Sequence, residues 1–241
     1  MVPSHVAWNH CPESYVAGDH SPERSTRQLF LERCFVFKIP PLPLRCPSTM
    51  SKSDAKLLRS MQALWLEADK LWQVNENAPE FHGFVAADYE QVFQSLVALR
   101  DQVVTVLEWG SGLGVVAIMA SRLGFEAHGI EAEPRLVDLS RDLASKYHAR
   151  AEFWTGNFIP DAYRWDAECV DEDFRTALDL AAGYDDFELE LRDFDLVYAY
   201  PWPTERAMYF DIMRKCGGSH ALLMLYDARE GISVDRVSEK K

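Results

Sequence analysis

Apolar residues early in the folded region repeat at the spacing of amphipathic helices. A helix that Ser53 can cap is predicted first, because its apolar positions fall at i, i+4, i+7, i+8, i+11, i+14 and i+15. These positions are Leu57, Met61, Leu64, Trp65, Ala68, Leu71 and Trp72. A second helix is predicted over 86–99, with an apolar side made by Tyr89, Val92, Phe93, Leu96 and Val97. One-sided stripes of this kind indicate helices that pack against a core.

Beyond residue 100 the pattern changes to short β-branched or apolar runs that alternate with helical spacing. Strands are predicted at 103–107, 125–130, 151–154, 196–200 and 221–226, and helices at 115–123 and 136–147. A last strand is expected at 232–237, as a hairpin across 227–231. This alternation predicts an α/β fold, with a Rossmann-like, doubly wound, mostly parallel sheet covered by helices on both faces. Ligands of such sheets bind at the carboxyl ends of the strands.

The first 50 residues differ in composition from the rest of the chain. They hold seven of the 12 prolines and three of the five cysteines, with little periodic apolar surface. We expect residues 1–50 to be a disordered extension, because so little apolar surface cannot offset the entropy of ordering. A Cys/His metal knuckle made by Cys11, His20, Cys34 and Cys46 is the alternative. Their spacing fits no ligand pattern, so no metal site is expected.

The remaining residues, 51–241, are expected to form a single domain, and translation of this part could begin at Met50. Its N-terminal helices occupy 51–100, and an acidic insertion at 161–193 is either a solvated face or a lid over the substrate. The domain holds 20 of the 25 Lys and Arg residues and 34 of the 38 Asp and Glu residues. Because no basic run is longer than two residues, we expect no binding to bulk nucleic acid.

Length and composition are those of a soluble globular protein. The chain has 241 residues, a net charge of −13 and 48% hydrophobic residues. No segment approaches the roughly 20 consecutive apolar residues of a membrane helix, and the N-terminus lacks a signal-peptide pattern. A cytoplasmic protein without a membrane partner is therefore expected. Five cysteines, an odd number without close pairs, indicate free thiols.

A glycine-rich loop follows the first predicted strand and precedes a helix. Its sequence is EWGSGLG, an ExGxGxG pattern that begins at Glu108. Gly110 and Gly112 let a ligand approach the backbone closely. A dinucleotide fingerprint, GxGxxG, would need a third glycine where Val115 stands. The carboxylate of Glu108 would repel a pyrophosphate but suits a ligand with an ammonium and a sulfonium.

At this point the sequence resembles the class I S-adenosylmethionine-dependent methyltransferases, over about 89–226. The resemblance implies that five residues of the loop hold the methionine end of S-adenosylmethionine, namely Glu108, Gly110, Ser111, Gly112 and Gly114. It also implies that Glu131, in GIEAEP, chelates the ribose hydroxyls. Asn157 would meet the adenine amino group, and Phe158 would flank the ring. The family generally adds a helix and two strands after the fifth strand, so the C-terminal strand set is expected to be shortened here.

The fourth predicted strand ends in FDLVYAYPWP, where amino-methylating relatives carry D/N-P-P-Y/F/W. Here Ala199 replaces the Asp or Asn that would accept a hydrogen bond from the target amine, which disfavours adenine or glutamine as the substrate. Tyr200 and Trp202 are the catalytic candidates, as an aromatic lip that could attract the sulfonium or a cationic substrate. A rigid turn that packs aromatic rings is the alternative. His82 is the best-placed histidine for a general base, although a lone loop histidine is more often a surface or capping residue.

Three function classes follow. The first is a methyltransferase that acts on a small molecule or a protein side chain, and the second is a non-catalytic protein that binds S-adenosylmethionine as a partner or sensor. A nicotinamide oxidoreductase is third and is disfavoured by Val115 and Glu108. The acceptor and the oligomeric state cannot be predicted from the sequence.

Overall fold

A computed structural model of the chain describes residues 50–81, 85–164, 175–177, 180–186 and 189–237. All of them belong to Lys38–Lys241, the second of the two units into which the chain divides. The predicted extension up to residue 49, with its cysteines, lies outside the described residues, as does His82. Parts of the acidic insertion also lie outside them.

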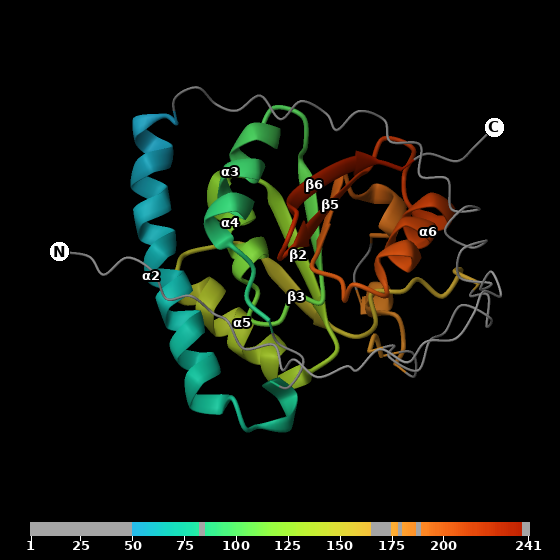
Figure 1. The fold of residues 1–241 in the computed structure, drawn as a ribbon, viewed down its shortest axis with the longest axis horizontal. Helices are drawn as coiled ribbons and strands as arrows, with labels where there is room; N and C mark the ends of the chain where they lie inside the picture. Colours follow the sequence, from blue (N-terminus) through green and yellow to red (C-terminus); the bar gives the residue numbers. More distant parts are fainter. Residues whose placement is uncertain (1–49, 82–84, 165–174, 178–179, 187–188, 238–241) are drawn as a thin grey trace, which may run out of the picture. The chain divides into compact units, whose positions relative to one another are not determined.

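The described residues form a six-stranded sheet in the order β3-β2-β1-β4-β5-β6 (Figure 1). Its strands are β1 (Thr105–Trp109), β2 (Glu126–Glu131), β3 (Glu152–Thr155), β4 (Leu196–Ala199), β5 (Leu222–Asp227) and β6 (Gly231–Arg236). The first five are parallel, and β6 pairs antiparallel with β5. Strand order reverses between β1 and β4, so the predicted doubly wound, mostly parallel sheet is confirmed.

Helices cover both faces of this sheet. They are α2 (Lys52–Asn75), α3 (Tyr89–Leu99), α4 (Val115–Leu123), α5 (Pro134–Lys146) and α6 (Arg206–Cys216). Helices α2 to α5 contribute to the core on one face, and α6 packs on the other (Figure 1). Short 3-10 turns, η1 (Pro79–Phe81), η3 (Gly183–Asp186) and η4 (Leu191–Asp193), complete the described elements. No helix within the described ranges is long and apolar enough to cross a membrane.

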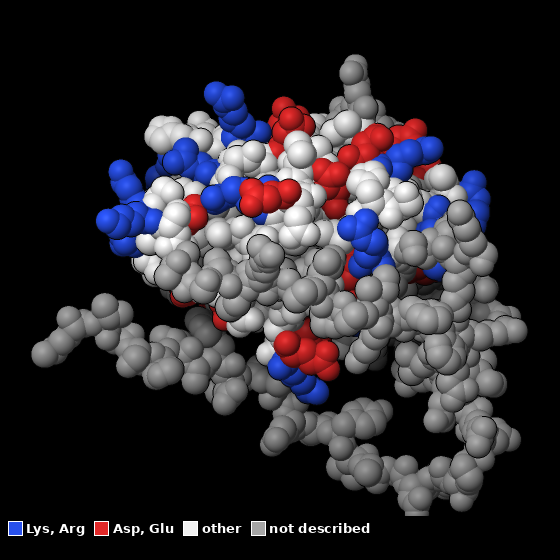
Figure 2. All heavy atoms as spheres, turned by 90° about the horizontal axis from the view of Figure 1, so that it is seen from above, with Lys and Arg blue, Asp and Glu red and all other residues white. Residues whose placement is uncertain are grey.

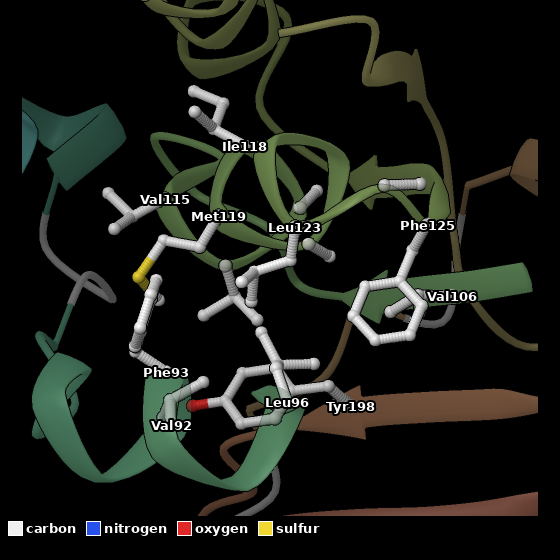
Figure 3. Packing of buried hydrophobic residues seen from close by; sticks show 14 of the residues in the cluster. Val92, Phe93, Leu96, Val106, Val115, Ile118, Met119, Leu123, Phe125 and Tyr198 are labelled. Carbon is white, nitrogen blue, oxygen red and sulfur yellow. The ribbon is translucent and has the colours of Figure 1, made fainter. Parts of the chain in front are cut away.

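The two sides of β1 explain this layering. Val106 points to the core beneath α3 and α4, whereas Leu107 and Trp109 point to the core beneath α6, as alternation along a strand requires. Figure 3 shows the first core, where side chains of α3 and α4 converge on Val106 and Tyr198. The sheet is therefore buried on both faces, as parallel sheets are.

The observed helix starts differ slightly from the predicted ones. Ser51, not Ser53, caps α2, and its hydroxyl accepts a hydrogen bond from the Asp54 amide. Helix α3 begins at Tyr89 because Asp88 caps it through the amides of Glu90 and Gln91. In both cases a side chain with good capping geometry fixes where the helix begins.

The predicted C-terminal hairpin is present. Asp227 closes its turn by accepting hydrogen bonds from the amides of Arg229 and Glu230, and Gly231 adopts a left-handed φ of 77°. Strand β6 then pairs along all of β5. Within the described residues, β6 is the one strand that follows β5.

Candidate active site

A cavity of about 640 Å³ opens where the parallel strands end. Its size lies within the range of roughly 300–1,000 Å³ that is typical of small-molecule sites. Nine of the ten residues proposed from the sequence line it: Glu108, Gly110, Ser111, Gly112, Glu131, Asn157, Phe158, Tyr200 and Trp202. The fold therefore brings together residues that are up to 94 positions apart, from Glu108 to Trp202.

Glu108 lies at the end of β1 and reaches the first turn of α4. Its Oε2 accepts a hydrogen bond of 2.8 Å from the Ala117 amide. Burial raises the pKa of Glu108 to about 8, although the amides of Ala117 and Val116 act to lower it. The Glu108 carboxyl group already accepts hydrogen bonds from amides at this helix N-terminus. These amides are therefore not available to bind a phosphate.

Glu131, at the end of β2, holds the glycine loop. Its Oε2 accepts a hydrogen bond of 2.7 Å from the Gly112 amide, and its Oε1 accepts one of 3.0 Å from the Glu133 amide. Burial raises the pKa of Glu131, against the lowering effect of these backbone donors. A carboxylate offers about four lone-pair sites. The Ala132 amide also acts on this carboxylate, so a ligand can use only the acceptor capacity that the three amides leave.

Gly114 does not line the cavity, unlike the other four loop residues that were proposed to hold the cofactor. It is the N-cap of α4, with a left-handed φ of 68°. A Cβ at this position would lie 2.5 Å from the ring of Phe153 and 2.9 Å from the Cβ of Ser140. Gly114 thus lets α4 approach β3 and α5 closely.

Two buried hydroxyls at the cavity have no hydrogen-bond partner among the described residues, those of Ser111 and Tyr198. Tyr198 is paired with Glu108 across β4 and β1. Buried polar atoms are nearly always hydrogen-bonded in native proteins. A polar ligand or a water molecule can supply the hydrogen-bond partner that each hydroxyl lacks.

The loop after β3 forms another wall of the cavity. The Asn157 Nδ2 donates to the Ala177 carbonyl oxygen at 2.5 Å, and its Oδ1 accepts from the Ile159 amide at 2.9 Å. Phe158 stacks on Trp109 with ring centroids 4.9 Å apart. The Trp109 indole also donates to the Tyr184 hydroxyl, so Trp109 packs within the core beneath α6.

The aromatic lip after β4 is joined by a short strap, residues 175–177. Tyr200 packs edge-on against Tyr226, with ring centroids 4.7 Å apart. The guanidinium of Arg175 lies over the Trp202 ring, 4.3 Å from its centroid. Part of the acidic insertion therefore reaches the cavity, where one of the two sequence interpretations placed a lid.

Several residues of this site are absent from the sequence prediction. They are Tyr89, Tyr198, Arg175, Thr176 and Glu205. Tyr198 stands one strand residue before Ala199 and could have been inferred from alternation. The strap residues lie in a segment without periodicity, and Glu205 contacts them across about 30 positions of sequence.

No protein-family model matches this sequence, and no curated protein matches it. Solved structures do resemble the fold. An RNA methyltransferase from Salinibacter ruber in complex with S-adenosyl-L-homocysteine has a TM-score of 0.44 at 17% identity, over 66% of this chain and 96% of that chain. A TehB-like SAM-dependent methyltransferase from Corynebacterium glutamicum has a TM-score of 0.39 at 15% identity, over 70% and 76%.

A SAM-dependent methyltransferase from Thiobacillus denitrificans, also in complex with S-adenosyl-L-homocysteine, has a TM-score of 0.40 at 15% identity. That match covers 64% of this chain and 54% of that chain. The assignment of a ligand to this chain therefore depends on the geometry of its own cavity.

Proposed function

We propose that the cavity binds S-adenosylmethionine and that the chain transfers its methyl group to a small molecule or a protein side chain. The observation that carries this proposal is a pair of carboxylates, of buried Glu108 and half-buried Glu131, at the ends of adjacent strands beside the glycine loop. A ligand with a cationic end and a diol suits both groups. A pyrophosphate suits neither.

The polar groups of the cavity fit such a ligand. Glu108 is placed to meet the ammonium, and the free lone pairs of Glu131 can accept from the two ribose hydroxyls. The unpartnered hydroxyl of Ser111 can complete the polar contacts. The Oδ1 of Asn157 has a second lone pair for the adenine amino group, and Phe158 would lie beside the ring.

The reaction needs alignment more than chemistry from the protein. S-adenosylmethionine held by Glu108, Glu131 and Asn157 would supply an activated methyl group, which an acceptor's electron pair would take up as the electron pair of the carbon–sulfur bond stays on sulfur. Tyr200 and Trp202 would orient the acceptor and exclude water. His82 stays a candidate base outside the described residues.

A non-catalytic protein that binds the same cofactor is the second candidate. It is favoured by the lip, where Ala199 replaces an amide acceptor and Arg175 covers a face of Trp202. A cell extract incubated with methyl-labelled S-adenosylmethionine separates the two. We expect label to enter an acceptor with the wild-type chain and with Glu126→Ala, at the amino end of β2, but not with Glu131→Ala. If the extract acceptors gain equal label with and without the chain, only the non-catalytic role as a cofactor-binding protein remains.

A further inference from the structure

Charged side chains around the cavity are sorted by strand. Glu108, Glu131 and Glu133 follow β1 and β2, on the cofactor side. The guanidinium-bearing residues that line the cavity, Arg175 and Arg229, lie with the lip after β4 and in the turn after β5. The acceptor side therefore differs in charge from the cofactor side.

Of the other two acids of the lining, Glu80 follows this division and Asp227 does not, which leaves two guanidinium groups and one carboxylate on the acceptor side. Glu80 lies 3.5 Å from Arg135, which places it at the start of α5 on the cofactor side. Asp227 lies on the acceptor side. Its Oδ1 is engaged with the amides of Arg229 and Glu230, and these hydrogen bonds lower its pKa.

Arg175 changes what the lip can recognise. Trp202 alone would offer its negative ring face to a cation. The protein's own guanidinium already lies over that ring, 4.3 Å from the centroid. The sequence led us to expect a cationic group on this face of Trp202. Because Arg175 gives the lip a positive charge, we now expect an anionic group there.

Buried hydrogen bonds hold the backbone of Arg175 in place. Glu205 is buried, with 1% of its surface exposed, and its Oε1 accepts hydrogen bonds from the amides of Arg175 and Thr176 at 2.6 and 3.2 Å. Its Oε2 accepts from the Thr176 hydroxyl at 2.7 Å. The other end of the strap is held by Asn157, which donates to the Ala177 carbonyl. A buried carboxylate and a buried amide thus fix the backbone that carries the guanidinium.

A guanidinium stacked on an aromatic face keeps its edge N–H groups free, and these match carboxylate or phosphate oxygens in pairs. Within the described residues no carboxylate forms an ion pair with Arg175. Its exposed side chain nonetheless lines the cavity. We propose that the methyl acceptor is a small molecule with an oxyanion, a carboxylate or a phosphate, which Arg175 binds while Trp202 and Tyr200 contact its apolar part. This proposal rests on the proposed function, because it names the substrate class of the same site.

The test uses ligand-observed NMR on the full chain, with and without saturating S-adenosylhomocysteine. The probes are benzoate, phenyl phosphate and benzyltrimethylammonium, so that the two anion arms distinguish carboxylate from phosphate. We expect one or both anions to bind the wild-type chain and the cation to be excluded. Arg175→Gln should weaken anion binding about tenfold or more, the scale of a lost charge-assisted hydrogen bond, and admit the cation to the uncovered Trp202 face. Arg175→Lys should retain part of the affinity.

The matched control is Arg150→Gln, an exposed arginine just before β3 at the opposite edge of the sheet, which should leave anion binding unchanged. The proposal is overturned if neither anion binds the wild type, if the cation binds it better, or if Arg175→Gln and Arg150→Gln have equal effects. Calorimetry with S-adenosylhomocysteine is run beside it. If the wild type does not bind S-adenosylhomocysteine but binds an anion in an Arg175-dependent way, the proposed function is contradicted and the anion site is not.

Discussion

Glu108 combines burial with a position at the mouth of the glycine loop. Its raised pKa, about 8, means that it is mostly protonated in the free protein near pH 6.5. An ammonium bound beside it favours the ionised form. Binding of S-adenosylhomocysteine should therefore release a proton at this pH, and affinity should rise with pH until about 8 and then level off.

Calorimetry in buffers of different ionisation enthalpy measures this release. The Glu108→Gln variant, which cannot ionise, should bind without it. An equal release in the variant, or none in the wild type, would mean that Glu108 does not face the cationic end of the ligand.

The lip residues should act on transfer and not on cofactor affinity. Tyr200 and Trp202 follow β4, which β1 separates from β2 and Glu131. Interactions that orient the acceptor affect the transition state more than ground-state binding of the cofactor. We expect Trp202→Ala or Tyr200→Phe to keep S-adenosylhomocysteine affinity within a few-fold and to lower methyl transfer by about tenfold or more. Kinetics with the acceptor found in the extract assay measure both. If both variants fold and transfer methyl groups normally, the lip is only a structural turn.

At this scale the sequence predicts residues whose role follows from local order. Glu108 and Glu131 could be placed because each ends a strand, and parallel strands bring their carboxyl ends to one edge. The contact of Arg175 with Trp202 could not be predicted. It depends on how Glu205 holds a non-periodic segment about 30 residues earlier in the chain.

Two glycines of one loop should respond differently to substitution. Both Gly110 and Gly114 have a left-handed φ, which costs an L-residue roughly 1–2 kcal/mol. A Cβ at Gly110 meets nothing within 4 Å, whereas one at Gly114 meets Phe153 at 2.5 Å. Overpacking of this kind adds about 1–3 kcal/mol. Gly114→Ala should therefore destabilise the fold clearly more than Gly110→Ala.

Urea denaturation of the two variants measures this difference in the free energy of unfolding. Each is the other's control, since the strain in φ is shared. Equal losses of stability would show that α4 does not depend on close approach to β3 and α5.

Elements were predictable where a single period dominates. The strands follow from short β-branched runs, and β6 from the turn residues before it. Helix α6 is absent from the predicted elements, although Met208, Tyr209, Ile212 and Met213 repeat at helical spacing and are buried. The helical spacing of α6 begins directly after a proline-rich turn, which hides the start of the helix. The start of α2 was likewise misplaced, because Ser51 and not Ser53 is its cap.

On the scale of the whole molecule, the described residues form a core on each face of the sheet. Their buried hydrophobic side chains run from Met61 to Val234. We expect a chain that starts at Met50 to keep the melting temperature of the full-length chain, because the omitted residues have little periodic apolar surface. Differential scanning calorimetry of both chains is the measurement. A large drop would show that residues 1–49 stabilise the core.

Charge on the described surface is mixed. Figure 2 shows Lys and Arg interspersed with Asp and Glu on the face seen from above. Together with the net charge of −13, this supports the expectation that the chain does not bind bulk nucleic acid, which stays a prediction.

Titration calorimetry of the full chain with S-adenosylhomocysteine, and separately with NAD, tests the central claim most directly. The wild type and Glu126→Ala, an exposed acid at the start of β2, should bind S-adenosylhomocysteine equally. Glu131→Ala should bind it about tenfold or more weakly, because charged acceptors of two hydroxyls are lost. NAD should not bind. Binding of NAD in preference to S-adenosylhomocysteine, or unchanged affinity in Glu131→Ala, would contradict the account.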